Sequence, residues 1–270
     1  MSIFSITPLL VLILPFFIRG AGPESVWQRS YNVRLAEDTT RTAHEVEQDS
    51  VLALLASLDQ GPFENAYSHL TSYGYTRYAR TEQFDAEDYM IAFTERITQI
   101  DTSGVMKELQ ADSSGRFDYG FFNRFVSENV STVDPVNLVP HLLPEDPPYL
   151  SSRKRDRFTY RFRPDTLLWD TAAQVIEIKA RPEVGDDQNI RRVRLYVGQR
   201  DHTLLAIYLE RIDLALLFRE ESDYFTHIRK TKEGDWVPYN TRYHTRIRTP
   251  FRSTRQFRTV ATYYSFVPKV

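Results

Sequence analysis

The feature that most constrains this chain is a long run of alternating apolar and polar residues between Phe158 and Phe266. Three passages set the pattern: Phe158–Pro164, Gln174–Ala180 and Arg191–Val197. In each passage apolar side chains recur at every second position, which is the period of a strand with one buried face and one wet face. Such a sheet must cover its apolar face. The pattern therefore predicts a mainly β protein in which helices or a ligand lie against one side of an antiparallel sheet.

The rest of the chain supplies further strands and two helices. Ala43–Leu58 carries apolar residues at helical spacing and ends before Gly61-Pro62, which predicts an amphipathic helix packed on the sheet. Asp134–Leu143 begins with a capping aspartate and a proline, which predicts a short second helix. Alternation and turn residues predict these remaining elements: strands at Ala66–Phe84, Tyr89–Ile100, Gly104–Gln110, Leu204–Arg211, Leu216–Lys230, Trp236–Thr249 and Arg255–Phe266, with turns at Ser113–Gly115, Gly198–Asp201 and Gly234–Asp235.

The N-terminus predicts export. Ile6–Ile18 is an apolar stretch too short to span a bilayer comfortably, and Gly20, Ala21 and Gly22 follow it. This order is typical of a secretory signal peptide. We expect residues 1–22 to be removed, residues 23–42 to form a flexible lead-in, and residues 43–270 to fold as one β domain.

Composition limits the kinds of catalytic and metal site that the chain can form. The 270 residues include no cysteine, which excludes disulfides, thiolate metal sites and a cysteine nucleophile. The six histidines are scattered, and the ten glycines form no phosphate-binding loop or nucleophile elbow. We therefore expect no enzyme, catalytic residue, metal site or cofactor.

Charge is uneven although the net charge is only −2. Between Thr226 and Arg258, nine basic residues face only Glu233 and Asp235. This segment predicts either a solvated strand face or a surface for an acidic protein or an anionic membrane. The residues expected to make such a contact are Arg242, Arg246, Arg248 and Arg255. Because we expect export, we expect no nucleic-acid partner.

One motif raises an alternative function. Pro164-Asp165, followed by Glu177-Ile178-Lys179, resembles the Pro-Asp…Glu-x-Lys signature of restriction-endonuclease-like nucleases. There the two acids hold a divalent cation and the lysine polarises the attacking water. A divalent-metal nuclease using Asp165, Glu177 and Lys179 is therefore an alternative, although Glu-x-Lys is also common on a wet strand face.

The layout as a whole resembles the LolA/LolB-like outer-membrane lipoprotein-sorting superfamily of periplasmic carriers. The resemblance lies in the order of signal peptide, amphipathic helix, first strands, short apolar helix and meander, and in Val175–Pro182, Arg194–Ile207 and Gly234–Pro238. It implies a curved, half-open antiparallel sheet, or incomplete barrel, covered by the N-terminal helix and a short lid helix. It also implies a periplasmic location, a role in lipoprotein transport and outer-membrane biogenesis, and lipoprotein acyl chains or lipid held between sheet and helices.

The expected ligand contacts follow from this layout. The lid helix would contribute Leu138, Val139 and Leu142, and the sheet would contribute Phe158, Tyr160, Phe162, Ile176, Ile178, Leu195 and Val197. A proline-rich insertion near Glu145–Pro148 departs from the basic carriers, so a sensor role also stays open. A further alternative is a scaffold with the same fold, a closed core and no ligand.

Overall fold

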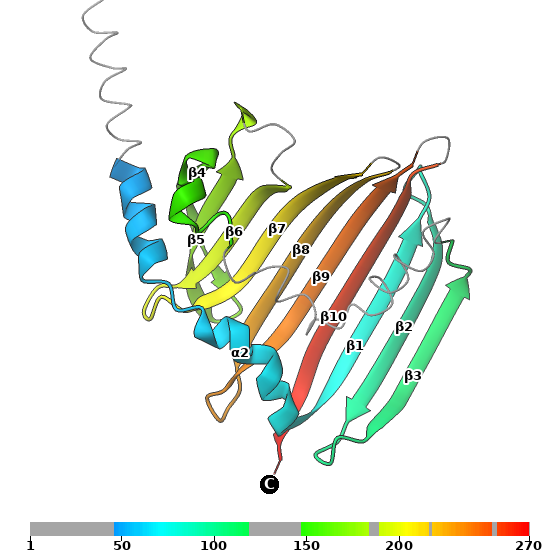
Figure 1. Ribbon diagram of the computed structural model, residues 1–270. Helices are drawn as coiled ribbons and strands as arrows, with labels where there is room; N and C mark the ends of the chain where they lie inside the picture. Colours follow the sequence, from blue (N-terminus) through cyan, green and yellow to red (C-terminus); the bar gives the residue numbers. More distant parts are fainter. Residues whose placement is uncertain (1–45, 119–146, 184–188, 216–217, 250–252, 270) are drawn as a thin grey trace, which may run out of the picture. The chain divides into compact units, whose positions relative to one another are not determined.

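The computed structural model describes residues 46–118, 147–183, 189–215, 218–249 and 253–269. These residues belong to one compact unit, Val46–Val270. They form a curved antiparallel sheet whose ten strands run in the order β3-β2-β1-β10-β9-β8-β7-β6-β5-β4 and do not close into a barrel (Figure 1). The expectation of a mainly β protein with an open, curved antiparallel sheet is confirmed.

The strands are long and their bounds follow the alternating pattern. They are β1 (Tyr73–Phe84), β2 (Met90–Ile100), β3 (Met106–Gly115), β4 (Phe158–Leu168), β5 (Thr171–Ala180), β6 (Ile190–Gly198), β7 (Leu204–Ala215), β8 (Phe218–Lys230), β9 (Trp236–Arg248) and β10 (Arg255–Pro268). From β4 to β10 each strand pairs with the next in sequence, as a meander does. Pro238 lies in β9 opposite Ile228, at a register shift, which is where a sheet tolerates a residue without an N–H.

Four short helical elements occur among the described residues. Residues 46–56 are helical, which confirms the described part of the predicted N-terminal helix. The second is α2 (Gly61–His69), which leads through the third, the 3-10 turn η1 (Leu70–Ser72), into β1. The fourth is another 3-10 helix, η4 (Ser152–Arg157), which precedes β4. None of the described helices is long and apolar enough to cross a membrane.

Two local predictions are wrong. The strand expected at Ala66–Phe84 begins only at Tyr73, because Gly61-Pro62 starts a helix instead of ending one. Proline is tolerated in the first turn, where its missing N–H would have no partner anyway. The turn expected at Ser113–Gly115 is instead the end of β3, which stays paired with β2 as far as Gly115.

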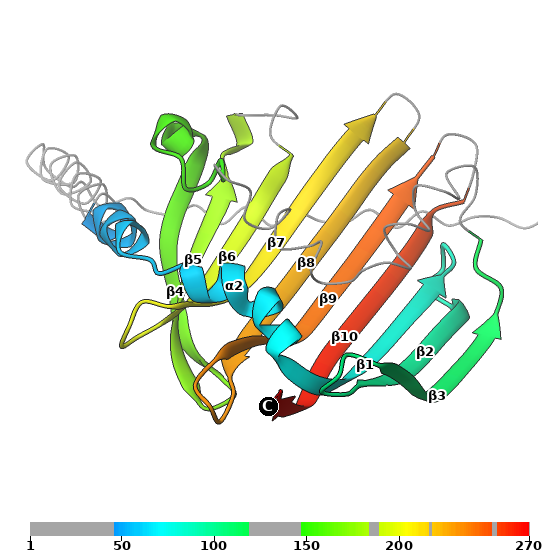
Figure 2. The same ribbon diagram turned by 60° about the horizontal axis from the view of Figure 1, so that its bottom comes forward.

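The two faces of the sheet differ in what covers them. Figure 2 shows α2 lying across one face near the ends of β7 to β10, and α2 contacts β7 and β9. We call this the inner face and the opposite one the outer face. The main apolar core lies between the inner face and the helices, with Val51 and Phe63 packed against strand residues such as Ile178.

Candidate functional site

The structure brings the predicted sheet residues together. Phe158, Tyr160, Ile176, Ile178, Leu195 and Val197 are buried in one apolar cluster, and Phe162 packs against it. Register explains the grouping. Phe162 pairs with Ile176, Ile176 with Leu195, and Leu195 with Ile207, so these four side chains form a row across β4 to β7. We call the seven residues with Val193, Ile207 and Leu209 the apolar patch. Whether they bind a ligand stays a prediction.

Elements outside the meander cover the apolar patch. Val51 of helix 46–56, Phe63 and Ala66 of α2, and Tyr149 are all fully buried in the same cluster. The hydroxyl of Tyr160 donates to the backbone oxygen of Tyr149 at 3.0 Å, which fixes the segment before η4 over β4. Burial raises the pKa of Tyr160 to about 12, so this hydroxyl stays protonated and keeps its donor at neutral pH. Sequence reasoning missed Phe63 and Ala66, because Gly61-Pro62 was taken as a helix end.

Helix 46–56 is held more lightly than α2. Val51 is fully buried, whereas Leu52, Leu54 and Leu55 are only partly buried and Val46 is 60% exposed. One polar contact adds to this packing, since the backbone N–H of Phe162 donates to Glu47 Oε1 at 3.0 Å. The helix therefore covers the patch with few contacts that would have to break if it moved.

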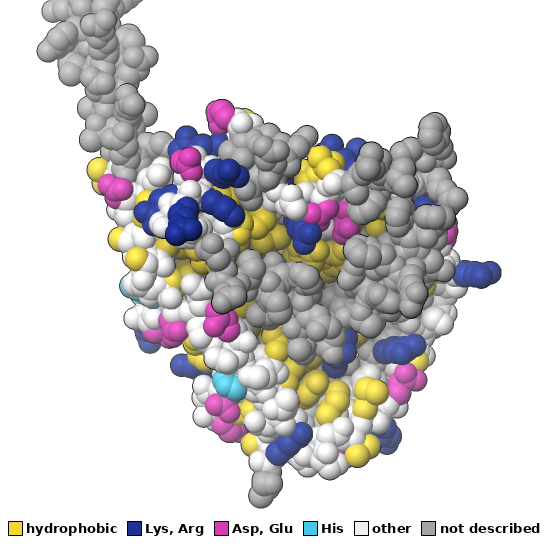
Figure 3. Space-filling model, in the orientation of Figure 1, with side chains coloured by type: hydrophobic (Ala, Val, Ile, Leu, Met, Phe, Trp, Pro, Cys, Tyr) yellow, Lys and Arg dark blue, Asp and Glu magenta, His cyan; other side chains and the backbone are white. Residues whose placement is uncertain are grey.

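The apolar patch ends at a polar boundary on β8 and β9. There the buried inner-face residues include Ser222, Thr226, Thr241 and Thr245, which bond one another in cross-strand pairs, beside Tyr243 and Ile247 of the apolar cluster. Glu220 Oε1 accepts hydrogen bonds from the hydroxyls of Ser222, Tyr243 and Thr245. The inner face is thus apolar from β4 to β7, whereas on β8 and β9 buried hydroxyls lie among the apolar side chains. Figure 3 shows hydrophobic side chains on this face beside the Lys and Arg group of η4.

The three lid residues, Leu138, Val139 and Leu142, lie outside the described residues, as does the whole predicted lid helix. Their contact with the patch therefore remains a prediction.

The residues of the nuclease alternative do not form a metal site. Glu177 is 1% exposed, and its two carboxylate oxygens accept from Arg163 Nη2 at 2.6 Å and Arg194 Nε at 3.2 Å. Burial alone would raise the pKa of Glu177, but the hydrogen bonds and charges of these arginines bring it below its ordinary value. Asp165 accepts a hydrogen bond from Gln199 instead. No group of metal-binding side chains occurs among the residues that the structure describes. Glu177 is thus the centre of an ion-pair cluster on the outer face.

The four arginines expected to meet a partner lie on different faces. Arg242, Arg246 and Arg248 share the outer face of β9, because the residues that alternate with them are buried. Arg255 belongs with the inner-face residues of β10, and its guanidinium bonds Asp118 Oδ2 at 2.8 and 3.2 Å. Arg255 therefore does not contribute to one surface with the other three.

Comparisons with known proteins give remote structural likenesses. No family model and no curated protein matches the chain. A protein of the DUF1329 family from Desulfovibrio piger is 10% identical, with a TM-score of 0.29, over 83% of this chain and 94% of its own. A LolA superfamily protein from Nitrosomonas europaea is 9% identical, with a TM-score of 0.24, over 82% and 94%. A putative outer membrane lipoprotein-sorting protein domain from Vibrio parahaemolyticus is 8% identical, with a TM-score of 0.24, over 73% and 86%.

The superfamily that the sequence resembles is thus among those matched, and the open curved sheet is of the kind that resemblance implies.

Proposed function

We propose that this protein is an exported, non-enzymatic carrier that binds an apolar ligand in the periplasm. The ligand would lie between the apolar patch and the helices that cover it. Lipoprotein acyl chains or a lipid are the ligand class long and apolar enough to cover a row of side chains that spans four strands. The three lid residues, Leu138, Val139 and Leu142, would complete the site.

One observation carries the proposal. Four neighbouring strands present a continuous apolar surface, and the helix above it buries only Val51 completely, with Leu52, Leu54 and Leu55 partly buried and the Phe162 N–H bonded to Glu47. A closed core is usually covered by a helix that buries a full apolar stripe. A cover with so few anchors can move aside at small cost.

The energies favour an exchange of helix for ligand. Burial of an acyl chain is worth roughly 0.8 kcal/mol per methylene, so about a dozen methylenes contribute on the order of 10 kcal/mol. Releasing helix 46–56 forfeits roughly 2 kcal/mol for Val51, about as much for the bond to Glu47, and on the order of 1 kcal/mol for each of the partly buried Leu52, Leu54 and Leu55. A long acyl chain therefore outweighs the contacts that it displaces.

The test uses a reversible lock on the helix. The chain contains no cysteine, so an engineered pair would be the only thiols present. Ser57 Oγ lies 2.9 Å from His202 Nδ1, which joins the residue just after helix 46–56 to the turn between β6 and β7. The double variant Ser57→Cys/His202→Cys would fix the helix when oxidised and free it when reduced. Each single variant is the matched control.

The measurement is uptake of a fluorescent sixteen-carbon fatty acid, with native mass spectrometry of the protein purified from its own periplasm before and after organic extraction. We expect an extractable acylated species. We also expect uptake by the oxidised double variant to fall at least tenfold and to recover on reduction. A clean apo mass together with no fatty-acid uptake would overturn the proposal and favour a scaffold with a closed core.

The outer face of β9 is suited to contact an anionic surface. Arg242 is exposed, the side chain of Arg248 is 50% exposed, and Arg246 is partly exposed beside them. Substituting all three by glutamine should weaken sedimentation with vesicles of anionic lipid and leave fatty-acid uptake unchanged. Equal sedimentation of the variant and the wild type would remove this partner.

A further inference from the structure

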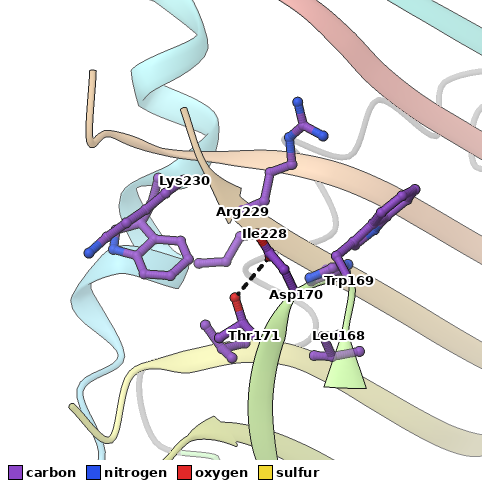
Figure 4. Close-up of a pocket in the computed structure, with 10 residues that line it drawn as sticks. Leu168, Trp169, Asp170, Thr171, Ile228, Arg229 and Lys230 are labelled. Atoms are coloured by element: carbon purple, nitrogen blue, oxygen red, sulfur yellow. Dashed lines mark hydrogen bonds between the residues drawn. The ribbon is translucent and has the colours of Figure 1, made fainter. Parts of the chain in front are cut away.

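A hollow separate from the apolar patch lies where the β4–β5 hairpin meets the β8–β9 hairpin. Its volume is about 700 Å³. Figure 4 shows Trp169, Asp170 and Thr171 of the first hairpin facing Ile228 and Arg229 of β8. The complete lining is Leu168, Trp169, Asp170, Thr171, Leu205, His227, Ile228, Arg229, Lys230 and Trp236. None of the ten residues expected to bind the apolar ligand belongs to it.

Aromatic rings form much of the wall. Trp169 sits at the hairpin tip with φ +59°, a left-handed conformation that a bulky residue adopts rarely. Its ring makes an edge contact with Tyr239, with centroids 4.8 Å apart, yet the residue is 64% exposed. Trp236 lines the hollow from the start of β9. Both indoles thus contribute apolar lining, and that of Trp169 is largely exposed to an incoming molecule.

The charges in the hollow are predominantly positive. Arg229 lies over the rings of Tyr239 and Phe266, with its guanidinium carbon 4.8 and 5.8 Å from the centroids, and Lys230 Nζ lies 4.9 Å from the Trp236 centroid. Within the described part of the chain, neither cation has a carboxylate at salt-bridge distance, and the buried Nε of Arg229 has no hydrogen-bond partner. The hollow therefore holds two cations against one carboxylate.

The remaining polar groups do not alter this balance. That carboxylate, Asp170, accepts a hydrogen bond from Thr171 Oγ1 at 3.4 Å. Burial, with a smaller contribution from the Arg229 charge, lowers the pKa of His227 to about 4. His227 is therefore neutral at pH 7 and adds no charge of either sign.

We propose that this hollow binds an amphiphilic anion, with its phosphate or carboxylate against Arg229, its apolar part against Trp169 and Leu205, and Lys230 as a second positive charge that favours the anion. Arginine and lysine supply N–H donors to an oxyanion, and an arginine already stacked on aromatic rings is held in place before binding. Apolar walls with a few convergent charges are the usual composition of a small-molecule site. The inference is independent of the proposed carrier function, because the two sites share no expected contact.

The tryptophans provide the measurement. The chain has three, and Trp169 and Trp236 both line the hollow. In a Trp27→Phe background, fluorescence therefore reports on this site alone.

The probes are octyl phosphate and octanoate, with octanol as the uncharged control and inorganic phosphate as the headgroup control. The variants are Arg229→Gln and, should that variant fail to fold, Lys230→Gln. The matched control is Arg258→Gln, because Arg258 also lies over a ring, 4.9 Å from the Phe84 centroid, but outside the hollow.

We expect octyl phosphate or octanoate to change the fluorescence saturably, and the tighter of the two identifies the headgroup. Arg229→Gln or Lys230→Gln should weaken binding at least tenfold, and Arg258→Gln should leave it unchanged. Octanol and inorganic phosphate should each bind at least tenfold more weakly than the amphiphilic anion. Absence of a saturable change, or equal affinity in the wild type and in a folded hollow variant, would overturn the proposal. Because a fatty acid is itself an amphiphilic anion, its uptake is compared in the wild type and in Arg229→Gln, and uptake that persists in the variant belongs to the apolar patch.

Discussion

The carboxylate of Glu47 accepts a hydrogen bond at 3.0 Å from the backbone N–H of Phe162, which lies 115 residues further along the chain. Phe162 is in β4, which ends the strand order and therefore has one unpaired edge. Its N–H lies on that free edge, because it bonds Glu47 and not β5. Unpaired N–H groups on an edge strand are a template for unwanted strand pairing. One side chain of helix 46–56 thus closes part of that edge and ties the helix to the apolar patch.

Replacing Glu47 by alanine should loosen this helix selectively. A hydrogen bond to a charged acceptor contributes about 1.5–3 kcal/mol, and this one is partly buried. We expect faster hydrogen exchange at the Phe162 amide and faster fatty-acid exchange, with little change in global stability. Asp49→Ala is the control, because Asp49 is exposed on the same helix. Unchanged exchange at Phe162 would show that the bond does not hold the helix.

Replacing Glu177 by glutamine should destabilise the fold and reduce its acid sensitivity. The variant leaves Arg163 and Arg194 without their shared carboxylate, which should cost about 2 kcal/mol after allowance for the partial exposure of both arginines. Because the pKa of Glu177 in the folded state is below its ordinary 4.5, its contribution is complete above pH 4.5 and is lost as pH falls through the folded value.

Urea unfolding at pH 7 and pH 3 would measure both effects. The control is Glu221→Gln, since Glu221 pairs with Arg219 at 2.9 Å but its side chain is 29% exposed. We expect that variant to lose less than about 1 kcal/mol. Equal losses in the two variants would contradict a special role for the Glu177 cluster.

His227 should make stability depend on pH in a higher window. Its pKa is about 4 in the folded protein and 6.5 ordinarily, so the unfolded chain binds the proton first. The contribution of neutral His227 to the free energy of unfolding is therefore complete above pH 6.5. It falls by as much as about 3 kcal/mol as pH drops to 4. His227→Gln should reduce the pH dependence of the urea midpoint between pH 6.5 and 5, where Glu177 does not titrate. An unchanged slope in that window would contradict the assignment.

Replacing Gly115 by alanine should unpair the end of β3. Gly115 has φ +74°, and an added Cβ would meet the backbone oxygen of Ile91 and lie 2.9 Å from Ala92 Cα. Gly234→Ala is the matched control, because its φ is +98° but no atom lies within 4 Å of an added Cβ. Hydrogen exchange should rise along the β2–β3 pairing in the first variant only. Equal protection in both would contradict the clash.

Much of the sheet could be predicted from sequence because its signal is local. The alternation that placed Phe158, Ile176 and Leu195 on one face needs only the two-residue strand period. The hollow under Trp169 could not be predicted in the same way. It depends on which hairpin tip reaches which neighbouring strand, and residues 168–171 and 227–230 are brought together only by the sheet.

The helices were harder to place for a different reason. Gly61-Pro62 is compatible with either the end or the start of a helix, and only the packing of Phe63 and Ala66 against the patch selects the start. The position of Arg255 was missed because the sequence does not reveal where the alternation resumes after the β9–β10 turn. Its partner, Asp118, lies 137 residues away.

The position of β1 between β2 and β10 has a consequence for how the protein is made. The hairpins β1–β2 and β2–β3 can pair as soon as they are synthesised. The other edge of β1 must wait for its partner strand, residues 255–268. Until then the nascent chain carries two separate half-sheets, each with an open hydrogen-bonding edge. Loss of β10 would therefore split the sheet in two instead of shortening it, and a chaperone that shields strand edges would be needed longest by this β1 edge.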